Sequence, residues 1–162
     1  MPFRKMRRAR QALNEADTRA ILKEGITAVL ALAGEDGYPY ALPVNYVFDG
    51  SAVYFHCARS GYKLECIARC DKASMCVVAQ DTVLSEKFTT LYKSAIAFGR
   101  IAVVSDEEEM RRAAYLLAKK YCPDETDMRI ADETDKFFPA LCILKLSVEH
   151  LSGKQGAEFL QK

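Results

Sequence analysis

The chain has 162 residues, 50% of them apolar, and a formal net charge of +1. This is enough apolar material for a core, so we expect a single domain over residues 1–162. A net charge this small excludes a general electrostatic attraction to nucleic acid or to acidic substrates. Because no run approaches the roughly 20 apolar residues that a membrane-spanning helix needs, we also expect no membrane partner.

The cysteines lack the CxxC spacing of zinc sites and the density of a disulfide scaffold. They lie within apolar runs or predicted helices, which is typical of free, buried thiols in a reducing compartment. We therefore predict a cytoplasmic protein. With only two histidines and no second cysteine pair, we predict no metal site. The six cysteines are Cys57, Cys66, Cys70, Cys76, Cys122 and Cys142.

The first twelve residues are strongly basic. Residues 1–12 fit either an arm that reaches an anion or a solvated, flexible tail, and we favour the tail. A short helix follows, capped by Asn14 or Asp17 and closed near Gly25. The basic residues of the arm are Arg4, Lys5, Arg7, Arg8 and Arg10.

Three strands are predicted next. Residues 26–33 and 51–57 are strand-like, and residues 40–48 alternate between two faces. The Asp36-Gly37 and Asp49-Gly50 pairs between them are typical of tight hairpin turns. The three strands are therefore expected to form an antiparallel meander.

The second half of the chain mixes helices with strands. Helices are predicted over residues 60–70 and 106–121, the second followed by a polar loop at 123–135. Strands are expected at 73–80 and 140–148. Between them, residues 87–104 are β-rich but too long for one ordinary strand, so a bend or break is expected.

That bend is expected near Lys93 or Gly99, as in a sheet that closes into a barrel. The predicted elements amount to about six strands with peripheral helices. The sequence therefore predicts a mainly β fold, a small six-stranded antiparallel barrel.

The start of the helix at 60–70 carries an unusual charge pattern. A helix N-terminus has partial positive charge and unpaired N–H groups, so its first turn normally recruits Asp or Glu. Here Ser60 can cap, but Arg59 and Lys63 flank the start and no carboxylate occurs before Glu65. An anion such as a phosphate, bound at this helix end, would account for the two cations.

The helix at 106–121 shows the ordinary pattern. Its start is predicted to carry a capping box from Ser105 to Glu108, within a run of four acidic residues. The contrast between two helices of one chain supports an anion site at the first of them.

Other residues have two readings. Pro43 and Asn45 could leave polar groups free for a planar ligand, or could mark an edge strand with a solvent-facing Asn. His56 could contact the same ligand or act as a proton donor, or it could be a half-buried barrel histidine with no role in binding. The hydroxyl-rich run at 89–94 fits a polar cleft, a subunit interface or an edge strand. His150 is assigned no role.

Several common catalytic motifs are absent. The sequence contains no GxGxxG, GxxxxGK[ST] or GxSxG motif. Cys57 beside His56 is not a nucleophile–base pair, because neighbouring residues of a strand point to opposite faces. A phosphate-type site in a chain so poor in catalytic groups favours a cofactor that brings its own reactivity.

These residues resemble those of a known family, the pyridoxamine 5′-phosphate oxidase-like, FMN-binding split-barrel proteins. Within them it is most similar to the 5-nitroimidazole-resistance (Nim-type) group. The likeness covers nearly the whole chain, and the order and spacing of its motifs are specific. The motifs are Met6 to Gln11, Glu35 to Tyr40, Pro43 to Tyr46, Phe55 to Ala58 with Gly61 to Lys63, and Tyr92 to Ser94 before Phe98-Gly99.

The resemblance implies a six-stranded split β-barrel that forms a homodimer, with FMN at the subunit interface. Residues 43–46 would lie against the isoalloxazine ring, and residues 56–63 would hold the phosphate through Lys63. Residues of the strand at 92–94 would reach the flavin from the other subunit. Family members often carry a hydroxyl residue where this chain has Cys57. The full set assigned to FMN is Pro43, Val44, Asn45, Tyr46, His56, Cys57, Ser60, Gly61, Lys63, Tyr92 and Ser94.

The resemblance also implies a reaction class. We expect an FMN-dependent oxidoreductase that reduces a small organic acceptor such as a nitroaromatic, with NADH or NADPH as a donor and His56 as the candidate proton donor. The alternatives are a non-catalytic protein that binds or senses flavin and a haem-binding split-barrel relative.

Overall fold

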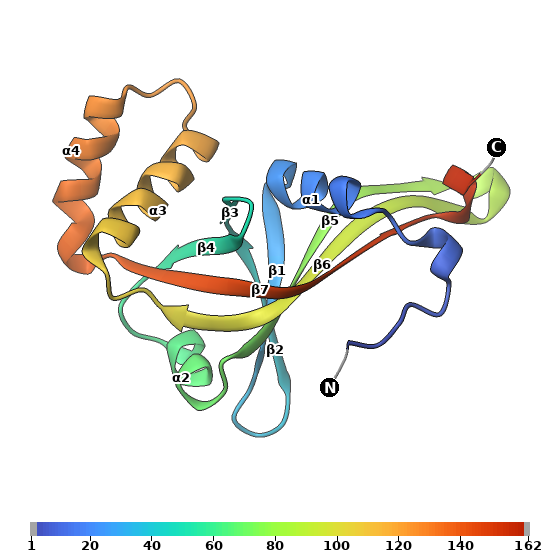
Figure 1. Cartoon of the computed structure of the whole chain (residues 1–162), viewed down its shortest axis with the longest axis horizontal. Helices are drawn as coiled ribbons and strands as arrows, with labels where there is room; N and C mark the ends of the chain where they lie inside the picture. Colours follow the sequence, from blue (N-terminus) through green and yellow to red (C-terminus); the bar gives the residue numbers. More distant parts are fainter. Residues whose placement is uncertain (1–2, 161–162) are drawn as a thin grey trace.

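The structure is a computed structural model that describes residues 3–160 (Figure 1). Within them it contains a seven-stranded antiparallel sheet and four α-helices, and it confirms the mainly β class. The helices are α1 (Glu15–Glu24), α2 (Tyr62–Arg69), α3 (Glu107–Tyr121) and α4 (Asp127–Phe137). The strands are β1 (Thr27–Ala33), β2 (Pro39–Asn45), β3 (Val47–Phe48), β4 (Ala52–Cys57), β5 (Lys72–Leu84), β6 (Thr89–Val103) and β7 (Cys142–Gln155).

The sheet curls into a split barrel. Its strand order is β2-β1-β5-β6-β7-β4-β3, so β2 and β3 form the two opposite edges. Only Tyr46 separates these two strands in the sequence, so the two edges must approach each other. This explains the one difference from six strands: the alternating stretch at 40–48 is divided at Tyr46 and contributes two strands, one to each edge.

The two hairpin signals of the predicted meander are confirmed. Gly37 and Gly50 have φ values of +83° and +101°, a left-handed backbone that favours glycine in tight turns. On β1 the side chains alternate between buried and exposed, with Ala28, Leu30 and Leu32 facing the core. That alternation is what lets one face of the sheet close over an apolar interior.

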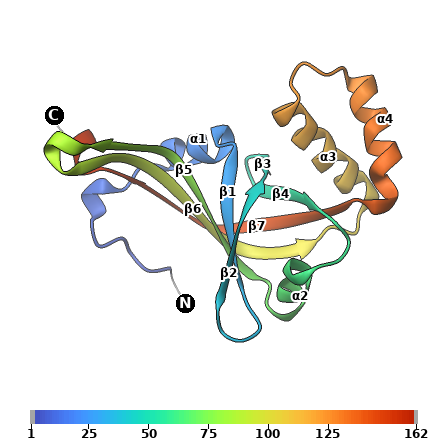
Figure 2. The same ribbon diagram turned by 180° about the vertical axis from the view of Figure 1, so that it is seen from behind.

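The β5–β6 hairpin is the longest feature of the sheet. It projects away from α3 and α4, as both views show (Figures 1 and 2). Of the bend or break expected in residues 87–104, the break does not occur, because β6 is continuous, and the register shifts at both predicted positions. One shift lies between Val78 and Gln80, opposite Lys93, and the other between Phe98 and Gly99. The extra residues lie on β5 and β7, the two partners of the long strand, so β6 continues through both irregularities.

Gly99 is required at the second irregularity by close backbone contact. A Cβ at this position would lie 1.9 Å from the carbonyl oxygen of Ser147 on β7. Both β5 and β7 also run beyond their predicted ends at 80 and 148. Their extensions form the hairpin and the strand beside it.

Three predictions about helices are wrong. The polar loop at 123–135 contains α4, capped by Thr126, whose hydroxyl accepts a hydrogen bond from the Arg129 N–H at 3.3 Å. Only Ile130 of α4 is buried, so this helix does not need a stripe of apolar residues. The sequence therefore lacks the pattern by which a helix is predicted. At α3 the N-cap is Asp106, not Ser105, because the Asp106 carboxylate accepts from the Glu109 N–H at 2.8 Å. The third correction, at the start of α2, is described with the candidate site.

The basic N-terminal segment packs on the sheet in the part that the structure describes. A short 3₁₀ helix, Ala9–Gln11, precedes a bridge between Ala12 and Lys154 of β7. The Phe3 ring stacks on His150 at 4.6 Å between ring centroids. The basic side chains between these two contacts are exposed, as expected for a solvated segment, whereas Phe3 and Ala12 contact β7. The flexibility of residues 1–12 stays a prediction, and residues 1–2 lie outside the described range.

None of the helices within residues 3–160 is both long and apolar enough to span a membrane.

Candidate functional site

The candidate anion site is the loop between the end of β4 and the start of α2. The loop leaves the sheet at Cys57 and enters the helix through Gly61, which is the N-cap. Gly61 has φ +129° and ψ 166°, a region of backbone space that is essentially restricted to glycine. The predicted cap, Ser60, is therefore wrong by one residue, because the chain turns into the helix only at Gly61.

No side chain caps α2. The N–H groups of Leu64 and Glu65 donate to the Gly61 carbonyl at 2.9 and 3.3 Å. Among residues 3–160, the N–H groups of Tyr62 and Lys63 find no acceptor. Such groups at a helix start are suited to bind an anion.

Lys63 is the cation that this helix start leaves unneutralised. Its side chain is half-buried and makes no ion pair with any residue of the described part of the chain. Arg59 differs, because its guanidinium donates to the carbonyl oxygens of Leu141, at 3.2 Å, and of Phe138, at 3.5 Å. Lys63 is therefore available to a ligand, whereas Arg59 ties the loop to the start of β7.

The neighbouring aromatic residues hold α2 in place. The Tyr62 hydroxyl accepts a hydrogen bond from the Glu35 N–H at 2.9 Å, and its ring meets Tyr40 of β2 edge-on at 5.0 Å. Arg69 at the other end of α2 forms an ion pair with Glu35 at 2.9 Å. The Glu35 carboxylate is thus paired with Arg69.

His56 and Cys57 occupy opposite faces of β4, as the strand geometry predicts. His56 is exposed, whereas Cys57 is half-buried against the core. Burial, together with the nearby Cys142 thiol, raises the pKa of Cys57 to about 11, although the Lys63 charge acts in the opposite direction. At neutral pH, Cys57 is therefore a neutral thiol that borders the candidate site.

The segment at 43–46 lies on an edge strand, as Pro43 predicts. Pro43 and Asn45 are exposed on β2, and the Val44 side chain packs against the core. Tyr46 is fully buried, and its hydroxyl donates to the Leu22 carbonyl at 2.8 Å. Its N–H and carbonyl both bond the Tyr121 hydroxyl, so Tyr46 has a role in the core. Its contact with a ligand stays a prediction.

Tyr92 and Ser94 lie on the projecting part of β6. Their register partners on β5 are Asp81 and Val78, whereas α2 lies near the opposite end of that strand (Figure 1). One copy of the chain therefore does not bring them to Lys63. The predicted contact of these residues with the same ligand requires a second subunit.

A cavity of about 340 Å³ adjoins the candidate site. It lies between the α2 end of the sheet and the start of α3. Its lining includes Arg59, Leu64, Met110 and Cys142.

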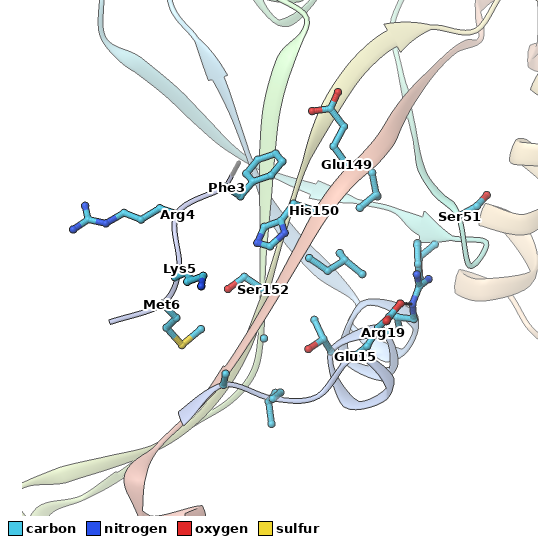
Figure 3. A pocket seen from close by; sticks show the side chains of 17 residues that line it. Phe3, Arg4, Lys5, Met6, Glu15, Arg19, Ser51, Glu149, His150 and Ser152 are labelled. Atoms are coloured by element: carbon cyan, nitrogen blue, oxygen red, sulfur yellow. Dashed lines mark hydrogen bonds and ion pairs between the residues drawn. The ribbon is translucent and has the colours of Figure 1, made fainter. Parts of the chain in front are cut away.

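A second cavity, of about 530 Å³, lies between the N-terminal segment, α1 and β7 (Figure 3). Its notable feature is His150, to which the sequence assigned no role. The His150 ring is stacked almost parallel to Phe3, at an interplanar angle of 10°, and lies 6.0 Å from the Phe98 ring. No local pattern in the sequence could have brought Phe3 to His150, because the contact depends on the path of the N-terminal segment.

Comparison with known proteins gives one family match. A family model described as Pyridoxamine 5′-phosphate oxidase matches residues 14–155. No curated protein matches the sequence significantly.

Solved structures share the fold at low sequence identity. A candidate 5-nitroimidazole antibiotic resistance protein from Bacteroides thetaiotaomicron VPI-5482 is 18% identical, with a TM-score of 0.75 over 89% of this chain and 86% of its own. A conserved hypothetical protein from Mycobacterium tuberculosis is 18% identical, with a TM-score of 0.81 over 98% and 94%. The FAD and Heme binding protein from Mycobacterium smegmatis is 21% identical, with a TM-score of 0.68 over 91% and 74%.

Proposed function

Since the chain belongs to the pyridoxamine 5′-phosphate oxidase family, we propose that it is an FMN-binding oxidoreductase that reduces a small organic acceptor. A nitroaromatic compound is the acceptor we favour, with NADH or NADPH as the electron donor. The proposed location is the cytoplasm, where reducing conditions keep the six thiols free.

The observation that carries this proposal is the uncapped start of α2. Two N–H groups without an acceptor and the unpaired Lys63 side chain belong to the first turn of α2, and the loop before it is exposed from Ala58 to Gly61. A phosphate dianion bound there would complete a helix end that no side chain caps. The residues present therefore fit the phosphate of FMN.

Each remaining residue has a distinct proposed role. Pro43 and Asn45 present the outer face of an edge strand to the flavin ring. When bound, the flavin supplies hydride chemistry that no side chain of this protein could provide. His56, exposed at the end of β4, is the candidate that holds a proton near the acceptor.

The proposal includes a homodimer with FMN at its interface. Tyr92 and Ser94 lie on the projecting β5–β6 hairpin and are too far along the sheet to join Lys63 of their own chain. A second copy would supply them. The hairpin also exposes apolar side chains, among them Val78 and Phe88, which are 62% and 97% exposed. Burial of such a patch would favour association.

The first experiment is spectroscopy of the purified protein. A flavin spectrum supports the proposal, and fluorescence after release separates FMN from FAD. A Soret band without flavin would instead favour a haem protein. The relative from Mycobacterium smegmatis is named for haem together with FAD.

The second experiment tests catalysis. FMN-loaded protein is mixed anaerobically with NADH or NADPH, and then with a nitroimidazole. Bleaching of the flavin by the donor and its return with the acceptor support an oxidoreductase. A bound flavin that neither donor reduces would favour a protein that only binds or senses flavin.

A further inference from the structure

We propose that Cys57 and Cys142 are a redox-active pair that forms a reversible disulfide at the base of the α2 loop. Cys57 is the last residue of β4, and Cys142 is the first residue of β7. The two strands are antiparallel neighbours, and these two residues are direct register partners.

The register places both thiols within bonding reach. Direct partners on antiparallel strands have Cα atoms about 4.5–5.5 Å apart, inside the range of about 4.4–6.8 Å that disulfides need. Their side chains also point to the same face, because both pack against the same core cluster. The pair ends the β4–β7 ladder, so the backbone on either side can adjust when the sulfurs approach.

The other four cysteines offer no comparable pair. Cys66 and Cys70 follow each other by one helical turn, Cys76 faces Val29 and Ile96 across its neighbouring strands, and Cys122 is exposed after α3. Only Cys57 and Cys142 face each other across a strand pair among these thiols, all of which the structure describes.

The surroundings give the two thiols different parts in the reaction. Cys57 is half-buried beside the exposed loop, so an oxidant can reach it first. Cys142 is 5% exposed and lines the cavity of about 340 Å³ behind the loop. Cys57 is therefore the attacking thiol, and Cys142 is the resolving thiol.

Hydrogen peroxide is the oxidant class that balances the step. The Cys57 thiolate attacks one peroxide oxygen, the O–O bond breaks, and Cys57 sulfenic acid forms with release of water. The Cys142 sulfur then displaces the sulfenic oxygen as a second water. Two thiols lose two electrons and two protons, and one peroxide becomes two waters. A dithiol reductant reverses the reaction by thiol–disulfide exchange.

The pair is coupled to the candidate site, a part of this inference that rests on the proposed function. Lys63 favours the Cys57 thiolate, and the raised pKa of Cys57 makes that thiolate scarce at neutral pH. A phosphate bound to Lys63 would cancel its attraction and cover the loop. FMN should therefore slow oxidation of Cys57, by roughly threefold or more.

The test treats the apo and FMN-loaded protein with hydrogen peroxide at pH 8.5, followed by alkylation and peptide mapping without reductant. A Cys57–Cys142 peptide, about 2 Da lighter than the two thiol peptides together and lost on reduction, is the expected result. Cys57→Ser and Cys142→Ser should abolish it, whereas Cys122→Ser should leave it. Mapping of the unmutated protein decides the question even if a variant does not fold.

Two outcomes would overturn the inference separately. If both Cys57 and Cys142 are still alkylated after peroxide treatment while other thiols are oxidised, the proposed Cys57–Cys142 disulfide is ruled out. Equal rates of Cys57 oxidation with and without saturating FMN would rule out the coupling to the candidate site, whereas the disulfide itself would stand. If FMN does not bind at all, the proposed function fails, and the result for the apo protein still decides the disulfide.

Discussion

Two helix starts in this protein solve the same electrostatic problem in different ways. At α3, the Asp106 carboxylate caps the Glu109 N–H at 2.8 Å, and Glu107, Glu108 and Glu109 fill the first turn. At α2, the N-cap is Gly61 with no side-chain cap, and the first turn holds the cation Lys63 and a single acidic residue, Glu65. The first helix start is complete within the chain, whereas the second is completed by a ligand anion in our proposal.

The largest expected effect comes from removal of the cation at α2. Lys63→Ala should weaken FMN binding by about 1.5–3 kcal/mol, because a charge-assisted, partly desolvated hydrogen bond is lost. This corresponds to a roughly 10- to 150-fold higher Kd, measured by quenching of flavin fluorescence. Lys72→Ala, an exposed lysine just beyond the other end of α2, is the matched control. Equal Kd values for the two variants would remove the phosphate assignment.

The second effect tests the backbone at the start of α2. Gly61→Ala should destabilise the protein by about 1–3 kcal/mol, because this backbone region is essentially restricted to glycine. The added Cβ meets no atom within 4 Å, so strain is the only cost. Thermal unfolding measures the stability and FMN titration measures the Kd, and both quantities should change in this variant.

Gly50→Ala separates strain from binding. Gly50 also has a positive φ and open space around it, but it lies in the β3–β4 turn beside α3. It should lower the unfolding temperature with little change in the FMN Kd. A large loss of FMN affinity in this variant would mean that instability alone weakens binding.

The third effect is on the helix that needs no ligand. Asp106→Ala should cost about 1 kcal/mol of stability through loss of the cap, which lowers Tm by about 2–4 °C in a domain of this size. The FMN Kd should stay the same, because α3 contributes no group to the proposed phosphate site. Asp106→Asn keeps a capping oxygen and should recover most of the loss. An FMN Kd that rises in Asp106→Ala would contradict the separation of the two helix starts.

Features that depend on local sequence could be predicted. The two Asp-Gly turns, the alternation along β1 and β2 and the unusual charge at α2 are set by residues close together in the chain. The predicted element at 123–135 was wrong because α4 buries only Ile130 and is held by Thr126 and by an Arg129–Glu125 ion pair of 3.2 Å. No apolar period marks such a helix.

Features that depend on distant pairing could not be predicted. The contact of Phe3 with His150 requires the N-terminal segment to lie along β7. The facing of Cys57 and Cys142 requires the register of β4 with β7, two strands far apart in the sequence. A shift of that register by one residue would turn one thiol to the other face, and no local pattern fixes the register.

The smallest effect comes from giving α2 the charge pattern of α3. Ser60 lies one residue before the N-cap and is exposed, so Ser60→Asp acts by charge rather than by capping. The new carboxylate should stabilise the apo protein by up to about 0.5 kcal/mol and weaken FMN binding by about 0.3–1 kcal/mol, because it competes with the phosphate for the same helix end. Thermal unfolding without FMN and fluorescence titration measure the two quantities, and both differences should shrink in high salt.

Ser60→Asn, nearly equal in shape but neutral, should show neither effect. Opposite signs for stability and binding cannot arise from damage to the fold, so a variant that loses both, or changes neither, would contradict an anion site at the start of α2.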